Sequence, residues 1–364
     1  MARLGETVAT LKTGRLPGGA PRGPARLQTV HDFGPNPGQL TMKVHAPARL
    51  GPGAALVVVL HGCTQTAEDY AAPAGWLDLA DRFGFVVVAP EQARANNSNL
   101  CFNWYQSGDI TRSGGEAASI AAMVSHAIRT HGLDPRRVFV TGLSAGGAMT
   151  SVMLATHPEM FAGGAVVAGL PYGVAASLHE AFEAMAMAAP PSAAGLGERV
   201  RRATPHPGPW PTVSVWHGQS DRLVRPAAGE AVAAQWRDVH GAKGRSRTAR
   251  TPDGREFLVW LSADGAPVVE LHRIPGLGHG APVKADGPNG CGHPSRYTPE
   301  TGLSASFEIA LGWGLVQRTT AQTPGDAGAI PRPDGVQPPP PSSESDPVTR
   351  IINDALRAAG LLRR

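Results

Sequence analysis

The chain has 364 residues, of which 42% are hydrophobic and 17% charged, and its formal net charge is +4. This composition indicates a globular protein with one large domain and appendages. It excludes a disulfide scaffold, because there are only three cysteines, and a membrane-spanning protein, because no run of roughly 20 apolar residues occurs. The basic residues come without a nucleic-acid-binding motif, so we expect no nucleic-acid partner.

Residues 1–38 are expected to form an N-terminal leader. Charged residues interrupt this segment before an apolar core can form, so no secretory signal peptide is visible and a cytoplasmic location is favoured. An extracellular location is the alternative. The catalytic domain is assigned to residues 39–318, and a peripheral strand is expected around residues 40–44.

Strands and helices then alternate along the chain. Short apolar runs predict strands at residues 55–60, 85–89, 137–141, 165–168 and 212–217. Helical spacing predicts helices at residues 76–83, 116–130 and 148–156. Two later runs, at residues 257–261 and 268–274, flank a turn and predict a hairpin. This order predicts an α/β fold with a mostly parallel sheet and helices on both faces.

The composition changes after about residue 318. Residues 319–347 are rich in Pro, Ser, Gly and Asp, which is typical of an extended linker. Residues 348–364 return to helical spacing and predict a short amphipathic helix. So short a helix needs a surface on which to bury its apolar stripe. We expect that surface to belong to the same chain or a partner subunit rather than to an external apolar surface, and the oligomeric state stays open.

The segment Gly142-Leu143-Ser144-Ala145-Gly146 has the GxSxG pattern of a nucleophilic serine. The pattern alone is weak evidence in a glycine-rich chain, but here a predicted strand leads into it and a predicted helix follows. Glycines are needed on either side because a Cβ would clash in so tight a turn. The sequence therefore predicts Ser144 as a nucleophile at the carboxyl edge of the sheet.

A serine hydroxyl needs a base to take its proton and an acid to orient that base. In enzymes with a GxSxG turn between a strand and a helix, the acid comes after the serine in the sequence and the histidine comes after the acid. Asp221 lies in a short loop after the predicted strand 212–217, and His279 lies between glycines after the strand 268–274. Both positions are on the same sheet edge as Ser144, so we predict Asp221 as the acid and His279 as the base.

The oxyanion formed by serine attack needs hydrogen-bond donors. We expect them to be the backbone N–H of Ala145, directly after the nucleophile, and the backbone N–H of Cys63, in the loop after the first buried strand.

Three residues are further candidates for substrate binding. His61 either positions the Cys63 loop or simply ends a buried strand. Trp104 and Tyr105 either form an apolar wall for the acyl group or pack under their loop. No metal-ligand spacing, phosphate-binding loop or dinucleotide fingerprint occurs, so we expect no metal and no cofactor.

Several motifs together resemble the esterase family of poly(3-hydroxybutyrate) depolymerases, whose relatives include feruloyl and acetylxylan esterases. The motifs are Leu60-His61-Gly62-Cys63-Thr64-Gln65, Pro90-Glu91-Gln92 with Asn96-Asn97, Cys101-Phe102-Asn103-Trp104, and Gly142-Leu143-Ser144-Ala145-Gly146-Gly147-Ala148-Met149. The resemblance covers about residues 40–315 and implies an α/β-hydrolase fold with the triad Ser144, Asp221 and His279. It also implies a disulfide between Cys63 and Cys101, with Cys291 left free.

We therefore predict a serine esterase that hydrolyses short hydroxyacyl esters, of oligo- or poly(3-hydroxybutyrate) type, through an acyl-enzyme. One alternative is a feruloyl or acetylxylan esterase acting on plant polysaccharide. A second is an acyltransferase that uses the same acyl-enzyme. A third, from another class, is a catalytically idle binding protein on the same scaffold, which the intact nucleophile, acid and base disfavour.

Overall fold

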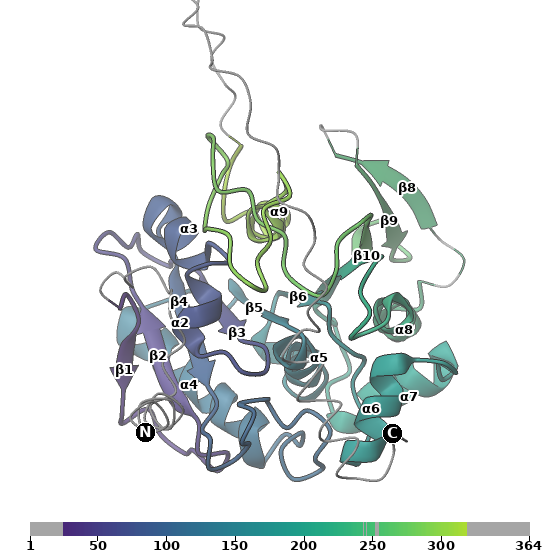
Figure 1. Ribbon diagram of the computed structural model, residues 1–364. Helices are drawn as coiled ribbons and strands as arrows, with labels where there is room; N and C mark the ends of the chain where they lie inside the picture. Colours follow the sequence, from purple (N-terminus) through teal and green to yellow (C-terminus); the bar gives the residue numbers. More distant parts are fainter. Residues whose placement is uncertain (1–24, 243, 245, 252–254, 319–364) are drawn as a thin grey trace, which may run out of the picture.

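A ten-stranded sheet organises the computed structural model, which describes residues 25–318 except 243, 245 and 252–254 (Figure 1). The strand order is β1-β2-β4-β3-β5-β6-β7-β10-β9-β8. The strands are β1 Gln28–Val30, β2 Thr41–His45, β3 Leu56–Leu60, β4 Val86–Glu91, β5 Val138–Leu143, β6 Gly163–Val167, β7 Thr212–Gly218, β8 Ser246–Arg250, β9 Glu256–Leu261 and β10 Pro267–Ile274.

The centre of this sheet is parallel and its two flanks are antiparallel. Six central strands lie side by side in the order β4, β3, β5, β6, β7 and β10, and each neighbouring pair among them is parallel. The flanking pairs β1–β2, β2–β4, β10–β9 and β9–β8 are antiparallel. The predicted α/β class, the mostly parallel sheet and the late hairpin are confirmed.

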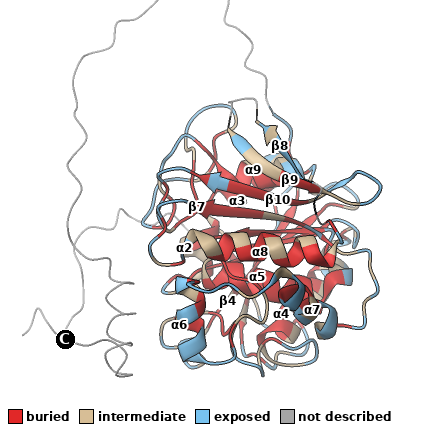
Figure 2. Ribbon diagram, turned by 90° about the vertical axis from the view of Figure 1, so that its right-hand side faces the viewer, coloured by how far each residue is buried: buried red, intermediate tan, exposed pale blue. Residues whose placement is uncertain are grey.

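Helices cover both faces of the sheet. They are α2 Ala67–Ala71, α3 Trp76–Phe83, α4 Gly115–His131, α5 Ala145–Thr156, α6 Leu178–Ala186, α7 Ala193–Ala203, α8 Pro226–Val239 and α9 Ala305–Gly312, with a short 3-10 helix at Pro158–Met160. One core cluster contains buried residues of α4, α5, α6, α7 and α8, and a second contains buried residues of α2, α3 and α9. Figure 2 shows the buried strands between these two helical layers.

Strand β3 shows how the sequence produces these two layers. Successive side chains of a strand point to opposite faces of the sheet. Leu56, Val58 and Leu60 accordingly join the first cluster, while Val57 and Val59 join the second. All five are buried, which explains why β3 reads as a continuous apolar run rather than an alternating one.

The folded body begins before residue 39, where the domain boundary was expected. β1 pairs with β2, and Leu27 is buried in the second core cluster. Arg26 forms ion pairs of 2.6 Å with both Asp78 and Asp81 on α3. The predicted linker 319–347 and the predicted helix 348–364 lie outside the described residues. Among the described helices, none has both the length and the apolar character needed to cross a membrane.

Candidate active site

Ser144 occupies the turn between β5 and α5. Its backbone has φ 59° and ψ −117°, a region that residues with a side chain rarely adopt. Neighbouring backbone groups hold it there, because its N–H donates to the Val167 carbonyl at 3.0 Å and its carbonyl accepts the Ala148 N–H at 2.9 Å. Such a strained turn, enforced from both sides, is typical of a residue placed for chemistry.

The glycines of the motif are required by close backbone contacts. A Cβ added to Gly142 would lie 2.4 Å from the carbonyl oxygen of Gly146. A Cβ added to Gly146 would lie 2.2 Å from the carbonyl oxygen of Leu60, at the end of the neighbouring strand β3. The turn can therefore pack against β3 only with glycine at both positions. This is the steric requirement that the sequence motif predicted.

Asp221 and His279 come together from two neighbouring parallel strands, β7 and β10. His279 Nδ1 lies 2.7 Å from Asp221 Oδ2. The other oxygen, Asp221 Oδ1, accepts the backbone N–H groups of Leu223 at 2.9 Å and Val224 at 3.0 Å. With these partners the carboxylate can orient the imidazole with its Nδ1–H toward the acid and its Nε2 free to accept a proton.

A second histidine, His217, which the sequence reasoning missed, lies behind the acid. It is fully buried at the end of β7, with Nε2 3.6 Å from Asp221 Oδ2 and 2.9 Å from the Val224 carbonyl, to which it donates. Burial opposes the charged form of Asp221, but His217 and His279 outweigh it and hold the pKa of that carboxyl well below its ordinary value. The sequence feature that could have indicated His217 is its position directly before the loop that carries Asp221.

Ser144 and His279 line the same pocket. Its volume is about 50 Å³, and its lining residues are Gly62, Cys63, Gln65, Trp104, Leu143, Ser144, Ala145, Leu170, Met185, Leu223, Val224, His279 and Tyr297. Within the described chain no hydrogen bond joins the Ser144 hydroxyl to His279. In unliganded enzymes this bond is often long and tightens only when a substrate binds. The pocket is small and mostly apolar, with the serine and the histidine at its polar side.

The two residues predicted to supply the oxyanion donors both line this pocket. Ala145 is the first residue of α5, so its N–H has no intrahelical acceptor. In the Cys63 loop the N–H groups on either side are occupied, since Gly62 donates to Gln65 Oε1 at 2.9 Å and Thr64 donates to the Asn99 carbonyl at 2.7 Å. In the part of the chain that the structure describes, the Cys63 N–H has no acceptor.

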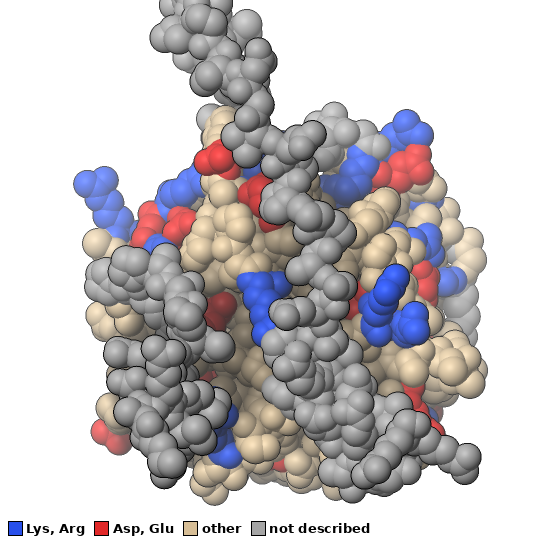
Figure 3. All heavy atoms as spheres, viewed as in Figure 1, with Lys and Arg blue, Asp and Glu red and all other residues tan. Residues whose placement is uncertain are grey.

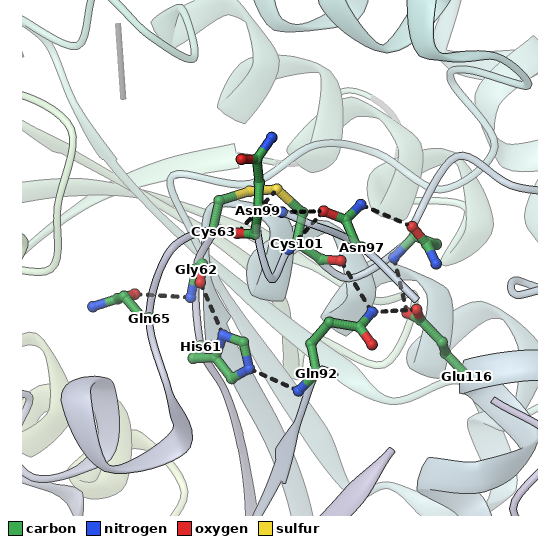
Figure 4. Close-up of a disulfide and its surroundings, with 10 residues drawn as sticks. His61, Gly62, Cys63, Gln65, Gln92, Asn97, Asn99, Cys101 and Glu116 are labelled. Atoms are coloured by element: carbon green, nitrogen blue, oxygen red, sulfur yellow. Dashed lines mark hydrogen bonds between the residues drawn. A yellow bond between two sulfur atoms is a disulfide. The ribbon is translucent and has the colours of Figure 1, made fainter. Parts of the chain in front are cut away.

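The Cys63 loop is tied covalently to the loop that carries Trp104. Cys63 and Cys101 form a disulfide with a Cα–Cα distance of 4.2 Å, and Cys291 is free and buried (Figure 4). The implied pairing is therefore present. Burial raises the pKa of the Cys291 thiol to about 11, so this cysteine is a poor nucleophile.

The three tentative substrate-binding residues differ in position. Trp104 lines the pocket, whereas Tyr105 does not line it and packs edge-on against Trp104 with ring centroids 5.4 Å apart. His61 also lies outside the pocket lining and is fully buried, and burial lowers its pKa to about 4. Its Nδ1 donates to the Gly62 carbonyl at 2.8 Å and its Nε2 accepts the Gln92 N–H at 3.1 Å, so no ring nitrogen remains for a substrate. Of the two interpretations offered for His61, the geometry favours positioning the loop.

Charged side chains are dispersed over the face shown in Figure 3. Blue and red residues alternate around its rim, and wide areas between them carry neither charge. Among the described side chains there is also no group of three or more His, Cys, Asp or Glu residues that could hold a metal ion.

The fold and the turn at Ser144 define an α/β-hydrolase, and the relatives of this chain are carboxylic ester hydrolases. The chain belongs to the family described as Esterase PHB depolymerase, whose pattern matches residues 45–258. Poly(3-hydroxyalkanoate) depolymerase C of Paucimonas lemoignei is 44% identical over 292 residues, which are 80% of this chain and 70% of that protein. An acetylxylan esterase of Coprinopsis cinerea is 34% identical over 275 residues, covering 72% of this chain and 71% of that protein. The structure of an acetyl xylan esterase from Aspergillus awamori superimposes with a TM-score of 0.66 at 25% identity, covering 80% of this chain and 99% of that one.

Proposed function

We propose that Ser144, His279 and Asp221 are the nucleophile, the base and the orienting acid of this serine esterase. The observation that carries the proposal is the 2.7 Å contact between His279 Nδ1 and Asp221 Oδ2, beside a pocket that His279 shares with Ser144. That contact directs Nε2 of His279 toward the pocket that holds the serine hydroxyl. The strained backbone of Ser144 supports the same assignment.

The reaction then runs in two acyl-transfer steps. Ser144 Oγ attacks the ester carbonyl and His279 Nε2 takes its proton, while the N–H groups of Cys63 and Ala145 bind the oxyanion. His279 gives that proton to the departing alcohol, and the acyl group stays on Ser144. Water attacks the acyl-enzyme with His279 again as the base, and the acid leaves as Ser144 recovers its proton.

The size and lining of the pocket support a short acyl group as the substrate. A cavity of about 50 Å³ walled by Trp104, Leu170 and Met185 has room for a few heavy atoms and favours apolar ones. A 3-hydroxybutyryl unit, with four carbons, is a short acyl group of this kind. Together with the 44% identity to a poly(3-hydroxyalkanoate) depolymerase, this favours oligomers or polymers of short 3-hydroxy acids.

Acetylated polysaccharide is the second candidate substrate. It is favoured by the superposition on nearly the whole length of an acetyl xylan esterase, and an acetyl group also fits the small pocket. The two substrates differ in the alcohol side, which is a further hydroxy acid in one and a sugar in the other.

A substrate panel tests both the site and the substrate. Hydrolysis of nitrophenyl acetate and butyrate, 3-hydroxybutyrate oligomers, amorphous polymer, acetylated xylan and methyl ferulate is compared between the wild type and Ser144→Ala. We expect rates on hydroxybutyrate oligomers well above those on xylan, and a loss of at least about a thousandfold in kcat for Ser144→Ala without unfolding. Near-normal turnover by folded Ser144→Ala would overturn the assignment of the nucleophile.

A further inference from the structure

A carboxylate buried behind the disulfide has no part in the mechanism above. Glu116 is the second residue of α4 and is 1% exposed. Its Oε1 accepts Gln92 Nε2 at 2.5 Å and its Oε2 accepts the backbone N–H of Asn103 at 2.8 Å (Figure 4). Burial raises the pKa of Glu116 to about 8, and Asp109 adds to this, while the donors from Gln92 and Asn103 act in the opposite direction. Gln92 and Asn103 both present donors and offer no acceptor for an acid proton, so these contacts hold the ionised form of Glu116, which predominates above about pH 8.

The contact with Gln92 leads to the oxyanion loop. Gln92 directly follows β4, and its backbone N–H donates to His61 Nε2 at 3.1 Å. This bond leaves the proton of His61 on Nδ1, from which it donates to the Gly62 carbonyl at 2.8 Å. In a trans peptide the carbonyl and the following N–H point in opposite directions, so fixing the Gly62 oxygen toward His61 turns the Cys63 N–H away from it. Cys63 lines the pocket, and its N–H is one of the two proposed oxyanion donors.

The contact with Asn103 leads to the opposite wall of the pocket. Glu116 fixes the backbone N–H of Asn103, and the next residue, Trp104, lines the pocket. The Asn103 side chain is held as well, because its Oδ1 accepts Asn97 Nδ2 at 3.1 Å. One carboxylate thus holds two points of the connection between β4 and α4, one that leads through His61 to the Cys63 loop and one next to Trp104.

We propose that Glu116 is a positioning residue of this esterase, whose carboxylate fixes Gln92 and Asn103 and thereby the Cys63 N–H and the Trp104 wall. The inference rests on the proposed role of Cys63 in the oxyanion hole.

The variant Glu116→Gln isolates this role, because it keeps the shape of the side chain. An amide offers one acceptor and one donor group, whereas Gln92 and Asn103 both present donors. One of the two contacts is therefore lost whichever way the amide turns. Oxyanion donors act most strongly in the transition state, so at pH 9, where the wild-type Glu116 is ionised, we expect kcat to fall about 10- to 100-fold while KM changes less than about threefold.

A double variant tests whether activity returns when the donor and the acceptor of the contact between residues 92 and 116 are exchanged. In the double variant Glu116→Gln/Gln92→Glu, donor and acceptor trade places across the same contact, while the Asn103 N–H keeps an acceptor. We expect this double variant to recover only part of the lost kcat, because Gln92 Nε2 also donates to the Cys101 carbonyl at 3.0 Å and the exchange removes that bond. The matched control is Ser119→Ala, one turn further along α4, which removes buried hydrogen bonds to Gly38 and Gly115 that lie outside the two loops. Its kcat and KM should stay near those of the wild type.

The outcomes separate this inference from the proposed function. If the wild type hydrolyses esters and folded Glu116→Gln retains kcat within about twofold, Glu116 does not position the site and the inference fails. Absence of esterase activity in the wild type would instead contradict the proposed function. Should Glu116→Gln not fold, Gln92→Met removes the same contact while keeping the carboxylate. A kcat lowered at least fivefold in that variant supports the inference, and an unchanged kcat overturns it.

Discussion

The two oxygens of Asp221 bind different partners. Replacing one of these oxygens by an NH₂ group should therefore change the protonation of His279. Oδ1 takes two backbone N–H groups, and Oδ2 takes His279. In Asp221→Asn the amide oxygen will satisfy the two backbone donors, which turns the NH₂ group toward His279 Nδ1. His279 is then forced to carry its proton on Nε2, where it cannot accept one from Ser144.

We therefore expect Asp221→Asn to keep its fold and to lose kcat by roughly 10²- to 10⁴-fold. Steady-state kinetics on a soluble ester and a thermal melt measure the two quantities. Asp238→Asn is the matched control, since Asp238 is also a buried acid but pairs with Arg201 at 2.7 Å. Equal losses of activity in both variants would indicate a general effect of removing a buried charge.

Buried histidines should make the protein sensitive to acid. Burial lowers the pKa values of His61 and His157 to about 4, below the value of about 6.5 expected in the unfolded chain. Between these values the unfolded state binds more protons, so the free energy of unfolding rises with pH and is lost as pH falls from about 6.5 to 4. A shift of this size corresponds to about 3 kcal/mol for a fully buried group.

The expected result is a Tm that drops steeply over this pH range, with a shallower slope in both His61→Gln and His157→Gln. Only His61→Gln should also lower kcat, because His157 contacts Thr156 rather than the oxyanion loop. If removing either histidine left the slope unchanged, the carboxylates would account for the acid sensitivity.

The sequence could indicate Ser144, Asp221 and His279 because each follows a strand and shares one edge of the sheet. The structure places Ser144 and His279 in one pocket and Asp221 in contact with His279, and whether the three act as assigned stays a prediction. His217 and Glu116 could not be found in this way, because their roles depend on contacts between distant segments. In the sequence, Glu116 is only an acidic residue at the start of a helix.

At the scale of elements, the disulfide joins the loops after β3 and β4 across 38 residues of sequence. Closing a loop of this length should stabilise the protein by about 2 to 4 kcal/mol. We expect the double variant Cys63→Ser/Cys101→Ser to lose that amount of unfolding free energy. Its kcat should fall by a larger factor than its KM rises, since the Cys63 N–H is a proposed oxyanion donor.

Chemical denaturation with and without reductant measures the effect. Reductant should destabilise the wild type and leave the double variant unchanged. Cys291→Ser serves as the control, because its buried thiol contacts Ser304 and is not part of the bridge. Counting thiols in denatured, unreduced protein should give one, and a count of three would contradict the bridge in solution.

Most elements marked by an apolar run or by helical spacing were predicted within a few residues, and α2 was among the elements that were missed. The helix at Trp76–Phe83 was predicted with its observed bounds, because one apolar stripe faces the core. The helix α9 is buried on nearly all sides and has no stripe, so no period marked it. The short β1 and the exposed β8 each lack an apolar run, since only edge strands leave most side chains in solvent. The helices α6, α7 and α8 were also not predicted.

At the scale of the whole chain, the described body spans residues 25–318 and contains every residue proposed for the site. We expect a variant limited to residues 25–318 to keep kcat and KM on soluble esters within about twofold of the full chain. A variant limited to residues 39–318 should be less stable by on the order of 2 kcal/mol, because it loses the buried Leu27 together with β1 and the Arg26 ion pairs.

Denaturation and ester kinetics on the three proteins separate these effects. Loss of soluble-ester activity in a folded 25–318 variant would place part of the site in the omitted ends. Equal stability of the two shortened variants would show that the segment before residue 39 contributes nothing to the folded body. Co-sedimentation with polymer particles tests the less favoured alternative, in which residues 348–364 dock on an apolar polymer granule rather than on this chain or a partner subunit.

The two outer strands of the sheet, β1 and β8, also bear on self-association of the protein in concentrated solution. An unpaired strand edge can add a strand from another molecule. β1 offers three residues for such pairing, and β8 carries the exposed side chains of Arg247 and Arg250. Arg250 forms an ion pair with Glu256 on β9, so the positive charge of Arg247 remains to repel a second copy of this edge. Salt shortens the range of that repulsion to about 8 Å at 0.15 M ionic strength. Self-association through β8 should therefore increase with salt, and light scattering across a salt series would detect it.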